Sequence, residues 1–272
     1  MSATDSLIGK TYAGGTFEVR AEHCQAYAAA TGDPSAAYEG DASIAPPMFH
    51  VRLLFPSMMA VAGDPELALD KARLVHGEHA VTHHAPLRPG DQAVCSARLL
   101  EVTEKSSGTL VVSGLYVHVG GELRTECRTS YFVRGKSTGG PKRPRAAPPE
   151  PPPADFEKSF DVPSDASHQY ALASLDDNPI HIDRDFALKA GLPDVILQGL
   201  CTMAMTLRDA IEFGAEGDPS RLQHGSVRFS GFVLNGDRLT TRAWRQEDGS
   251  LALLTLGPSG KPVITHAVAR FS

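Results

Sequence analysis

Residues 170–183 read Tyr-Ala-Leu-Ala-Ser-Leu-Asp-Asp-Asn-Pro-Ile-His-Ile-Asp, and they place a carboxylate, Asp176, five residues before an imidazole, His181. Between the two, Pro179 fixes its own φ and disfavours the helical region for Asn178. The chain therefore turns sharply between the carboxylate and the imidazole. We expect both side chains to face one pocket at this turn.

The two side chains have the acid–base properties that water activation needs. An unperturbed Asp has a pKa near ~4 and an unperturbed His a pKa near ~6.5. Asp176 and His181 can therefore hold one water molecule between them and move its proton to a neighbouring atom close to neutral pH. The same stretch is also compatible with an ordinary turn that caps a helix, so the residues that follow decide between the two interpretations.

The residues after the turn favour the catalytic interpretation through a family resemblance. They include Phe186-Ala187, Ala190-Gly-Leu-Pro193 and Val195-Ile-Leu-Gln-Gly-Leu-Cys-Thr202. Together with residues 170–183, these blocks resemble the hydratase 2 motif of the MaoC-like, (R)-specific enoyl-CoA hydratases. That family includes the hydratase part of peroxisomal multifunctional enzymes.

The resemblance implies a role for each matched residue. The counterparts of Asp176 and His181 bind the water that adds across the double bond of a trans-2-enoyl thioester, and the counterpart of Asn178 helps to order them. The main-chain amide at Gly199 points toward the thioester oxygen, at a helix start whose free N–H groups and dipole favour negative charge. Apart from these matched roles, the residues expected to contact the substrate from their places in the chain are Gln198, Ser174, His50, Arg184 and Arg228.

The implied function is that of a carbon–oxygen lyase. It interconverts trans-2-enoyl-CoA and (R)-3-hydroxyacyl-CoA, with no metal and no cofactor other than the coenzyme A of the substrate. Two alternatives stay open. One is a dehydratase that acts on 3-hydroxyacyl chains bound to an acyl carrier protein in fatty-acid or polyketide assembly, and the other is a non-catalytic hot-dog protein that binds acyl thioesters.

Two positions depart from the family pattern. Leu175 stands where the pattern usually has Gly, and Gln198 stands where it has the His of a His-Gly pair. We expect Leu175 to reshape the turn that carries Asp176. We expect Gln198 to lie beside the oxyanion amide, either behind the acid and base or on the rim of the pocket.

Composition excludes several other classes of function. The chain has 272 residues, of which 42% are hydrophobic, and a formal net charge of -6, so nucleic acid and anionic lipid surfaces are not expected partners. No apolar run approaches the ~20 residues that a bilayer span needs, and a cytoplasmic location is expected. No Cys-x-x-Cys is present, and reduced, buried thiols are expected at Cys24, Cys95, Cys127 and Cys201.

A linker divides the chain into two similar halves. Residues 135–155 are rich in Pro and Gly and poor in core-forming residues, which predicts a linker between domains at residues 1–134 and 156–272. Its basic residues Lys142, Arg143 and Arg145 are interpreted as solvated. Aligning Tyr27 with Tyr170 pairs Asp33 with Asp176 but Tyr38 with His181, so the first copy keeps the carboxylate and lacks the base.

Both halves have the same predicted order of elements, which indicates one fold unit used twice. Each half begins with a predicted helix, at residues 21–31 and 167–175, and continues to a long apolar helix, at residues 49–62 and 199–212. In the second half, residues 184–190 are predicted to form a short helix between these two. Period-two alternation predicts strands at residues 92–100, 225–232, 238–246, 251–256 and 263–271. The predicted fold is α+β, a double hot-dog in which two antiparallel sheets each wrap a central apolar helix and can join.

Two groups of residues carry weaker expectations. His76, His79, His83 and His84 lie close together in sequence, but strand alternation points His83 and His84 to opposite faces, so exposed or interface histidines are expected rather than a metal site. An anionic coenzyme would need a local basic patch, for which the candidates are Arg184, Lys189, Arg221 and Arg228. An acyl carrier protein would use the same charges.

Association into a homodimer is left open.

Overall fold

The computed structural model describes residues 5–70, 73–135 and 151–272. The first half contains η1 (Asp5–Leu7), β1 (Thr11–Glu18), α1 (Ala21–Ala30), η2 (Ala36–Tyr38), η3 (Pro47–Phe49), α2 (His50–Ala62), β2 (Leu74–His83), β3 (Gln92–Lys105), β4 (Gly108–Val119) and β5 (Glu122–Arg134). The second half contains β6 (Phe156–Asp161), α3 (Ala166–Ser174), α4 (Pro179–Ile182), α5 (Arg184–Lys189), α6 (Gly199–Gly214), η5 (Pro219–Arg221), β7 (Leu222–Phe229), β8 (Arg238–Arg245), β9 (Leu251–Leu256) and β10 (Pro262–Phe271).

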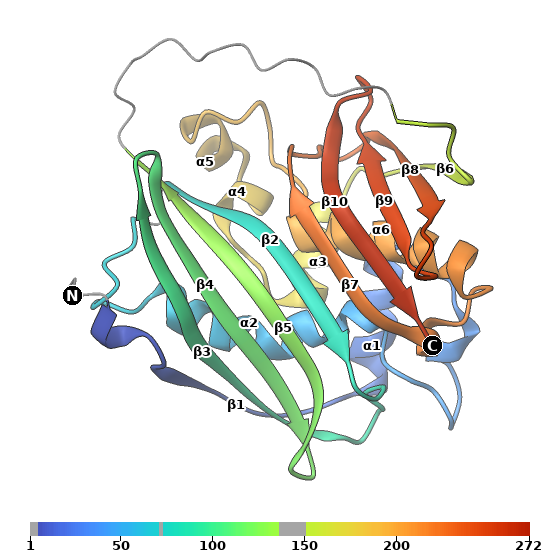
Figure 1. Ribbon diagram of the computed structural model, residues 1–272, viewed down its shortest axis with the longest axis horizontal. Helices are drawn as coiled ribbons and strands as arrows, with labels where there is room; N and C mark the ends of the chain where they lie inside the picture. The colour runs from blue at the N-terminus through green and yellow to red at the C-terminus, as the bar shows by residue number, and fades with distance from the viewer. Residues whose placement is uncertain (1–4, 71–72, 136–150) are drawn as a thin grey trace.

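The strands form one continuous, curved antiparallel sheet (Figure 1). Its order is β1-β3-β4-β5-β2-β7-β10-β9-β8-β6, so the second half repeats the order of the first half in reverse. The two five-stranded halves meet where β2 pairs with β7. The fold is therefore the predicted double hot-dog, with its two sheets joined into one.

The seam between β2 and β7 lies on a pseudo-twofold axis. Ala80 of β2 pairs directly with Ser226 of β7. The sequence offset that aligns Asp91 with Asp237, at the matching turns before β3 and β8, also aligns Ala80 with Ser226. Two equivalent residues that pair with each other mark the position of the axis, as expected for a repeated unit.

The two long helices pack against the same face of the sheet, α2 over the first half and α6 over the second (Figure 1). Almost every residue of α6 from Leu200 to Ile211 is buried, as its apolar sequence predicts. The close approach of α6 to the sheet depends on Gly225 of β7, because a Cβ added there would lie 2.8 Å from Cδ1 of Leu207 on α6. This contact shows that Gly225, and with it Val227 by alternation, faces α6.

The helices that precede the two turns meet at the same axis. The hydroxyl groups of Tyr27 on α1 and Tyr170 on α3 are hydrogen-bonded at 2.9 Å, and both side chains are fully buried. These are the two residues that the internal alignment pairs. The contact joins the two copies directly in front of the turns that carry Asp33 and Asp176.

The predicted helices agree with the observed ones to within two residues at each end, whereas β3 extends to Lys105, well beyond the predicted end at residue 100. Most of the predicted linker, with Lys142, Arg143 and Arg145, lies outside the described residues. In the part of the chain that the structure describes, no helix is both long enough and apolar enough to cross a membrane.

Candidate active site

The structure brings Asp176 and His181 together across the predicted turn. The Nε2 atom of His181 lies 4.0 Å from Oδ2 of Asp176. The side chain of His181 is 9% exposed and that of Asp176 is 20% exposed. The distance is too long for a good direct hydrogen bond and leaves the two groups able to share a water molecule.

Short α4 holds the imidazole in place. Asn178 is the N-cap of this helix, since its side chain accepts a hydrogen bond from the amide of Ile180, and Pro179 occupies the first helical position. The Nδ1 atom of His181 donates a hydrogen bond of 2.7 Å to the carbonyl oxygen of Ile196. When the imidazole is neutral, its proton is therefore on Nδ1, and the free lone pair of Nε2 faces Asp176.

Burial shifts the pKa of each group in the direction that favours its neutral form. Burial raises the pKa of Asp176, and the nearby imidazole opposes that shift. Burial lowers the pKa of His181, and the Asp176 carboxylate and the bond to Ile196 oppose that shift. His181 is therefore an unprotonated base at neutral pH.

The turn that carries Asp176 explains the family's glycine at position 175. Leu175 ends α3 with φ 71° and ψ 7°, a left-handed conformation that suits Gly and strains other residues. Leu175 is 40% exposed, so burial does not compensate for that strain. Ser174, expected to contact the substrate, is instead fully buried; its hydroxyl donates to the carbonyl of Tyr170 and accepts from the amide of Asp176.

Gln198 supports the same turn from behind. It is fully buried, so the structure does not place it on an exposed rim. Its Nε2 atom donates to the carbonyl oxygens of Ser167 at 3.0 Å and of Asp176 at 3.1 Å. Gln198 thus links both ends of the α3 region to the start of α6.

Gly199 opens α6 beside side chains that sequence reasoning missed. A Cβ added at Gly199 would lie 3.1 Å from Cε1 of Phe229, so this packing leaves little room for a side chain. The ring of Phe229 contacts the ring of His76, with centroids 4.8 Å apart, and His76 in turn contacts Tyr131 at 5.0 Å. Burial, and to a smaller extent the charge of Asp176, raise the pKa of this first-half tyrosine, Tyr131.

A second residue from the first half, Arg52 of α2, anchors the turn. Its Nη1 atom donates to the carbonyl oxygens of Leu172 at 3.1 Å and of Ala173 at 2.9 Å. These are orphan carbonyls at the C-terminal end of α3, directly before Asp176. Arg208 of α6 caps the end of α1 in the same way, through the carbonyls of residues 31 and 32.

The corresponding turn of the first copy has a different pair. The hydroxyl of Tyr38 donates a hydrogen bond of 2.6 Å to Oδ2 of Asp33. Burial raises the pKa of Asp33, and this hydrogen bond opposes the shift. Tyr38 stands at the position that aligns with His181, and its hydroxyl is hydrogen-bonded directly to the Asp33 carboxylate. The first copy therefore lacks the base.

The residues proposed for coenzyme binding differ in their partners and in the side of the sheet that they face. Arg184 is exposed and pairs with Asp194. Arg221 donates to the carbonyl oxygen of Ser272. Arg228 alternates with Val227 on β7 and therefore points away from α6, to the opposite face of the sheet. The structure therefore contradicts the expectation for Arg228, whereas coenzyme binding by Arg184, Lys189 and Arg221 stays a prediction.

The histidines also differ from their predicted positions. His83 and His84 do lie on opposite sides, and His84 is exposed beside Glu126. However, His79 is 1% exposed and neighbours the ring of the partly exposed His76, so an exposed position is wrong for His79. His50, expected to contact the substrate, is the first residue of α2 and is also 1% exposed, because its ring packs beside those of His79 and His83.

Comparisons with known proteins cover both halves of the chain. A model described as "MaoC like domain" matches residues 146–265, and one described as "FAS1-like, dehydratase domain region" matches residues 6–123. The chain is 33% identical over 242 residues to mouse peroxisomal multifunctional enzyme type 2, covering 85% of this chain and 32% of that protein. It is 30% identical to 3-hydroxyacyl-thioester dehydratase Y of Mycobacterium tuberculosis, covering 68% of this chain and 66% of that protein.

The fold is similar to that of a solved MaoC-like dehydratase from Phytophthora capsici, with a TM-score of 0.87 at 22% identity over 100% of this chain and 98% of that one. The fold is thus a double hot-dog whose second copy carries the acid–imidazole turn. The chain belongs to the MaoC-like hydratase family. It spans about a third of the length of the multifunctional enzymes that it matches.

Proposed function

We propose that this protein adds water to trans-2-enoyl-CoA to give (R)-3-hydroxyacyl-CoA and catalyses the reverse reaction. The observation that carries the proposal is the position of His181, whose Nδ1–H is held by Ile196 so that Nε2 faces Asp176 at 4.0 Å. Relatives named as an enoyl-CoA hydratase and as a 3-hydroxyacyl-thioester dehydratase support this reaction class.

In the proposed reaction, Asp176 polarises a water molecule and His181 carries its proton. The water oxygen forms a bond to C3 as a proton passes to Nε2 of His181. The π electrons move to the thioester oxygen, where the amide of Gly199 at the start of α6 stabilises the negative charge. The electrons then return to form the C2–H bond with the proton from His181, so that H and OH are added overall.

The pH dependence should report the protonation state of His181. Because burial lowers its pKa, the free base persists as pH falls below the ordinary histidine range. The hydration rate at pH 6.5 should therefore stay close to the rate at neutral pH and should decline only at more acidic pH. Steady-state rates across this range would check the shift.

The second candidate function is dehydration of acyl chains on a carrier protein. The match of residues 6–123 to the model described as "FAS1-like, dehydratase domain region" favours it. The reaction and the site residues would be the same, and only the carrier would differ. Either carrier could use exposed basic residues such as Arg184, so the charges on the surface do not select between the two carriers.

The test is to supply purified protein with crotonyl-CoA, longer and branched enoyl-CoA substrates, and the same acyl groups on an acyl carrier protein. Loss of the ultraviolet absorbance of the enoyl thioester reports hydration, and chiral analysis identifies the product. Turnover of free CoA thioesters to the (R) product is expected. Turnover of carrier-bound substrates alone would favour the second candidate, and binding without turnover would favour a non-catalytic protein.

The remaining expectations stay predictions. They are the absence of a cofactor beyond the coenzyme A of the substrate, the cytoplasmic location and association into a homodimer. Relatives with peroxisomal names are among the matches, so the location needs its own measurement.

A further inference from the structure

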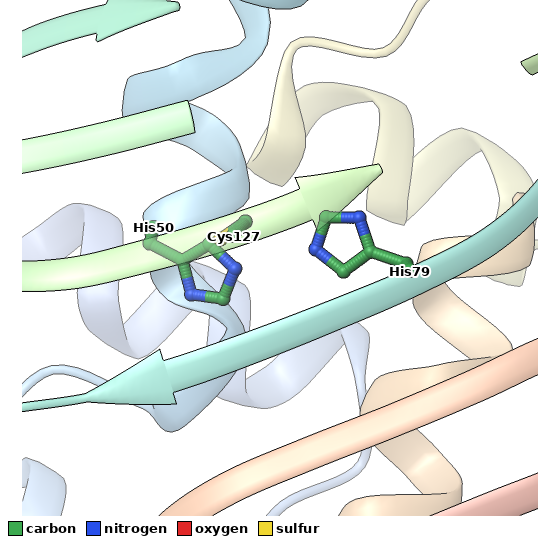
Figure 2. Close-up of side chains that lie close together, drawn as sticks. All are labelled: His50, His79 and Cys127. Carbon is green, nitrogen blue, oxygen red and sulfur yellow. The ribbon is translucent and has the colours of Figure 1, made fainter. Parts of the chain in front are cut away.

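Three buried side chains that the proposed reaction does not use converge between α2 and the centre of the sheet. They are His50 at the start of α2, His79 on β2 and Cys127 on β5. One potential ligand atom from each lies within 4.8 Å of the others. Figure 2 shows the ring of His79 extending from β2 toward that of His50, close to where β5 carries Cys127.

The nitrogen atoms of this cluster lack partners. Within the described residues, His50 Nε2, both ring nitrogens of His79 and Nε2 of the neighbouring His83 are buried without a hydrogen bond. Each buried polar atom left in that state costs roughly 1–3 kcal/mol, and native structures hold few of them. Each neutral ring among them offers one lone pair, so a group of such atoms favours a bound species that can accept these lone pairs.

His50 is oriented as metal-bound histidines are. Its Nδ1 atom is 2.8 Å from the carbonyl oxygen of Pro47, which fixes the ring proton on Nδ1 and leaves Nε2 free to bind. Metal-ligating histidines commonly donate their second nitrogen to a carbonyl or carboxylate in this way. A neutral His50 ring with its proton on Nδ1 is the form that binds a metal ion through Nε2.

We propose that His50, His79 and Cys127 bind one zinc-like divalent metal ion, with a water molecule in the fourth position. Two imidazoles and one thiolate form a ligand set that suits Zn²⁺. A tetrahedral ion holds its ligand atoms about 3.3–3.6 Å apart, so the side chains close in slightly around it. Cys127 binds as the thiolate and releases its proton to solvent.

The ion would connect α2 to β2 and β5 beside the seam between the two halves. Its expected role is to stabilise this junction, because a ligand that binds only the folded state shifts unfolding in its favour. The test reads metal binding and thermal unfolding instead of turnover. Failure of the proposed hydration would therefore leave this result unaffected.

The experiment uses the full chain after treatment with a chelator, titrated with Co²⁺ as a spectroscopic substitute and then with Zn²⁺. One Co²⁺ ion per chain should give a thiolate-to-cobalt charge-transfer band and the visible bands of four-coordinate cobalt. Zn²⁺ should displace the cobalt and raise Tm. Cys127→Ser and His79→Gln should each lose the charge-transfer band and weaken binding at least 10-fold.

Cys95→Ser is the matched control, since Cys95 is also a buried thiol but lies on β3 and outside the cluster. It should bind cobalt as the wild type does. If the wild type shows neither a charge-transfer band nor a rise in Tm with Zn²⁺, the cluster is a water-filled polar pocket and the proposal is overturned. Retention of the band in Cys127→Ser would overturn it as well, and the wild-type result decides even if a variant misfolds.

Discussion

The Tyr38 hydroxyl donates a 2.6 Å hydrogen bond to the Asp33 carboxylate, at the position where the second copy holds His181 at 4.0 Å from Asp176. Because no base is present there, Asp33→Asn should keep the hydration rate within about twofold of wild type, whereas Asp176→Asn should not. Steady-state kinetics on both folded variants checks this. Loss of turnover in Asp33→Asn would show that the first copy also takes part in catalysis.

Arg52→Met should lower kcat about 10-fold or more with a smaller effect on KM. Arg52 holds the carbonyls of Leu172 and Ala173, and without it the turn that positions Asp176 can shift, which is costly for a reaction that depends on alignment. Arg52→Lys should recover part of the rate. Steady-state kinetics, with unfolding curves to compare stability, separates positioning from simple loss of folded protein.

Arg208→Met is the control for Arg52→Met, because Arg208 caps the equivalent end of α1 and also pairs with buried Asp209. The Arg208→Met variant should lose at least as much stability as Arg52→Met, while its folded form keeps the wild-type kcat. Equal losses of kcat in the two variants would show that Arg52 has only a structural role.

Leu175→Gly should stabilise the protein by about 0.5–1 kcal/mol, since it relieves a left-handed conformation at an exposed residue. Leu172→Gly is the comparison, because Leu172 is 74% exposed within α3 and its replacement should destabilise by about 1 kcal/mol. Denaturant unfolding of both variants gives the two values. A loss of stability in Leu175→Gly would mean that the side chain has a packing role that outweighs the strain.

Stability should fall as pH decreases below the ordinary histidine range. Burial lowers the pKa of His50 and His76 to about 4 and that of His83 to about 3. In the unfolded chain these residues bind protons below pH ~6.5, so acid favours unfolding until the folded pKa values are reached. Each of these histidines should lower the free energy of unfolding by roughly 1 kcal/mol between pH 7 and pH 5.5.

Urea unfolding at pH 7 and pH 5.5, with a chelator present, measures this loss. His83→Gln should make the pH dependence less steep by about the share of one histidine. Equal unfolding free energies at the two pH values would show that these side chains are already protonated or solvated in the folded state.

Local signals made much of the fold predictable. The repeat, the two apolar helices and the Asn178-Pro179 turn each depend on neighbouring residues, and the structure places them as predicted. The burial of His79 depends instead on the pairing of β2 with both β5 and β7. Alternation along β2 showed that His83 and His84 point in opposite directions, but it could not show which of them faces α2.

The site was predictable to the same extent. Asp176 and His181 lie in one turn, so their spacing alone indicated a pair. Arg52 acts on α3 across a large separation in sequence, and a lone arginine in an apolar helix gives no signal of that contact. Arg228 was misassigned because its strand was recognised without knowing which face of the sheet α6 covers.

The central claim is that Asp176 and His181 act together on one water molecule. It is tested most directly by kcat/KM for hydration of crotonyl-CoA, or of whichever enoyl thioester the wild type accepts, in Asp176→Asn, His181→Ala and the double variant. Each single change should lower the rate by about 10² to 10⁴-fold, and the double variant should be hardly slower than the worse single one. A folded single variant within about threefold of wild type, or a double variant whose losses multiply, would contradict the account.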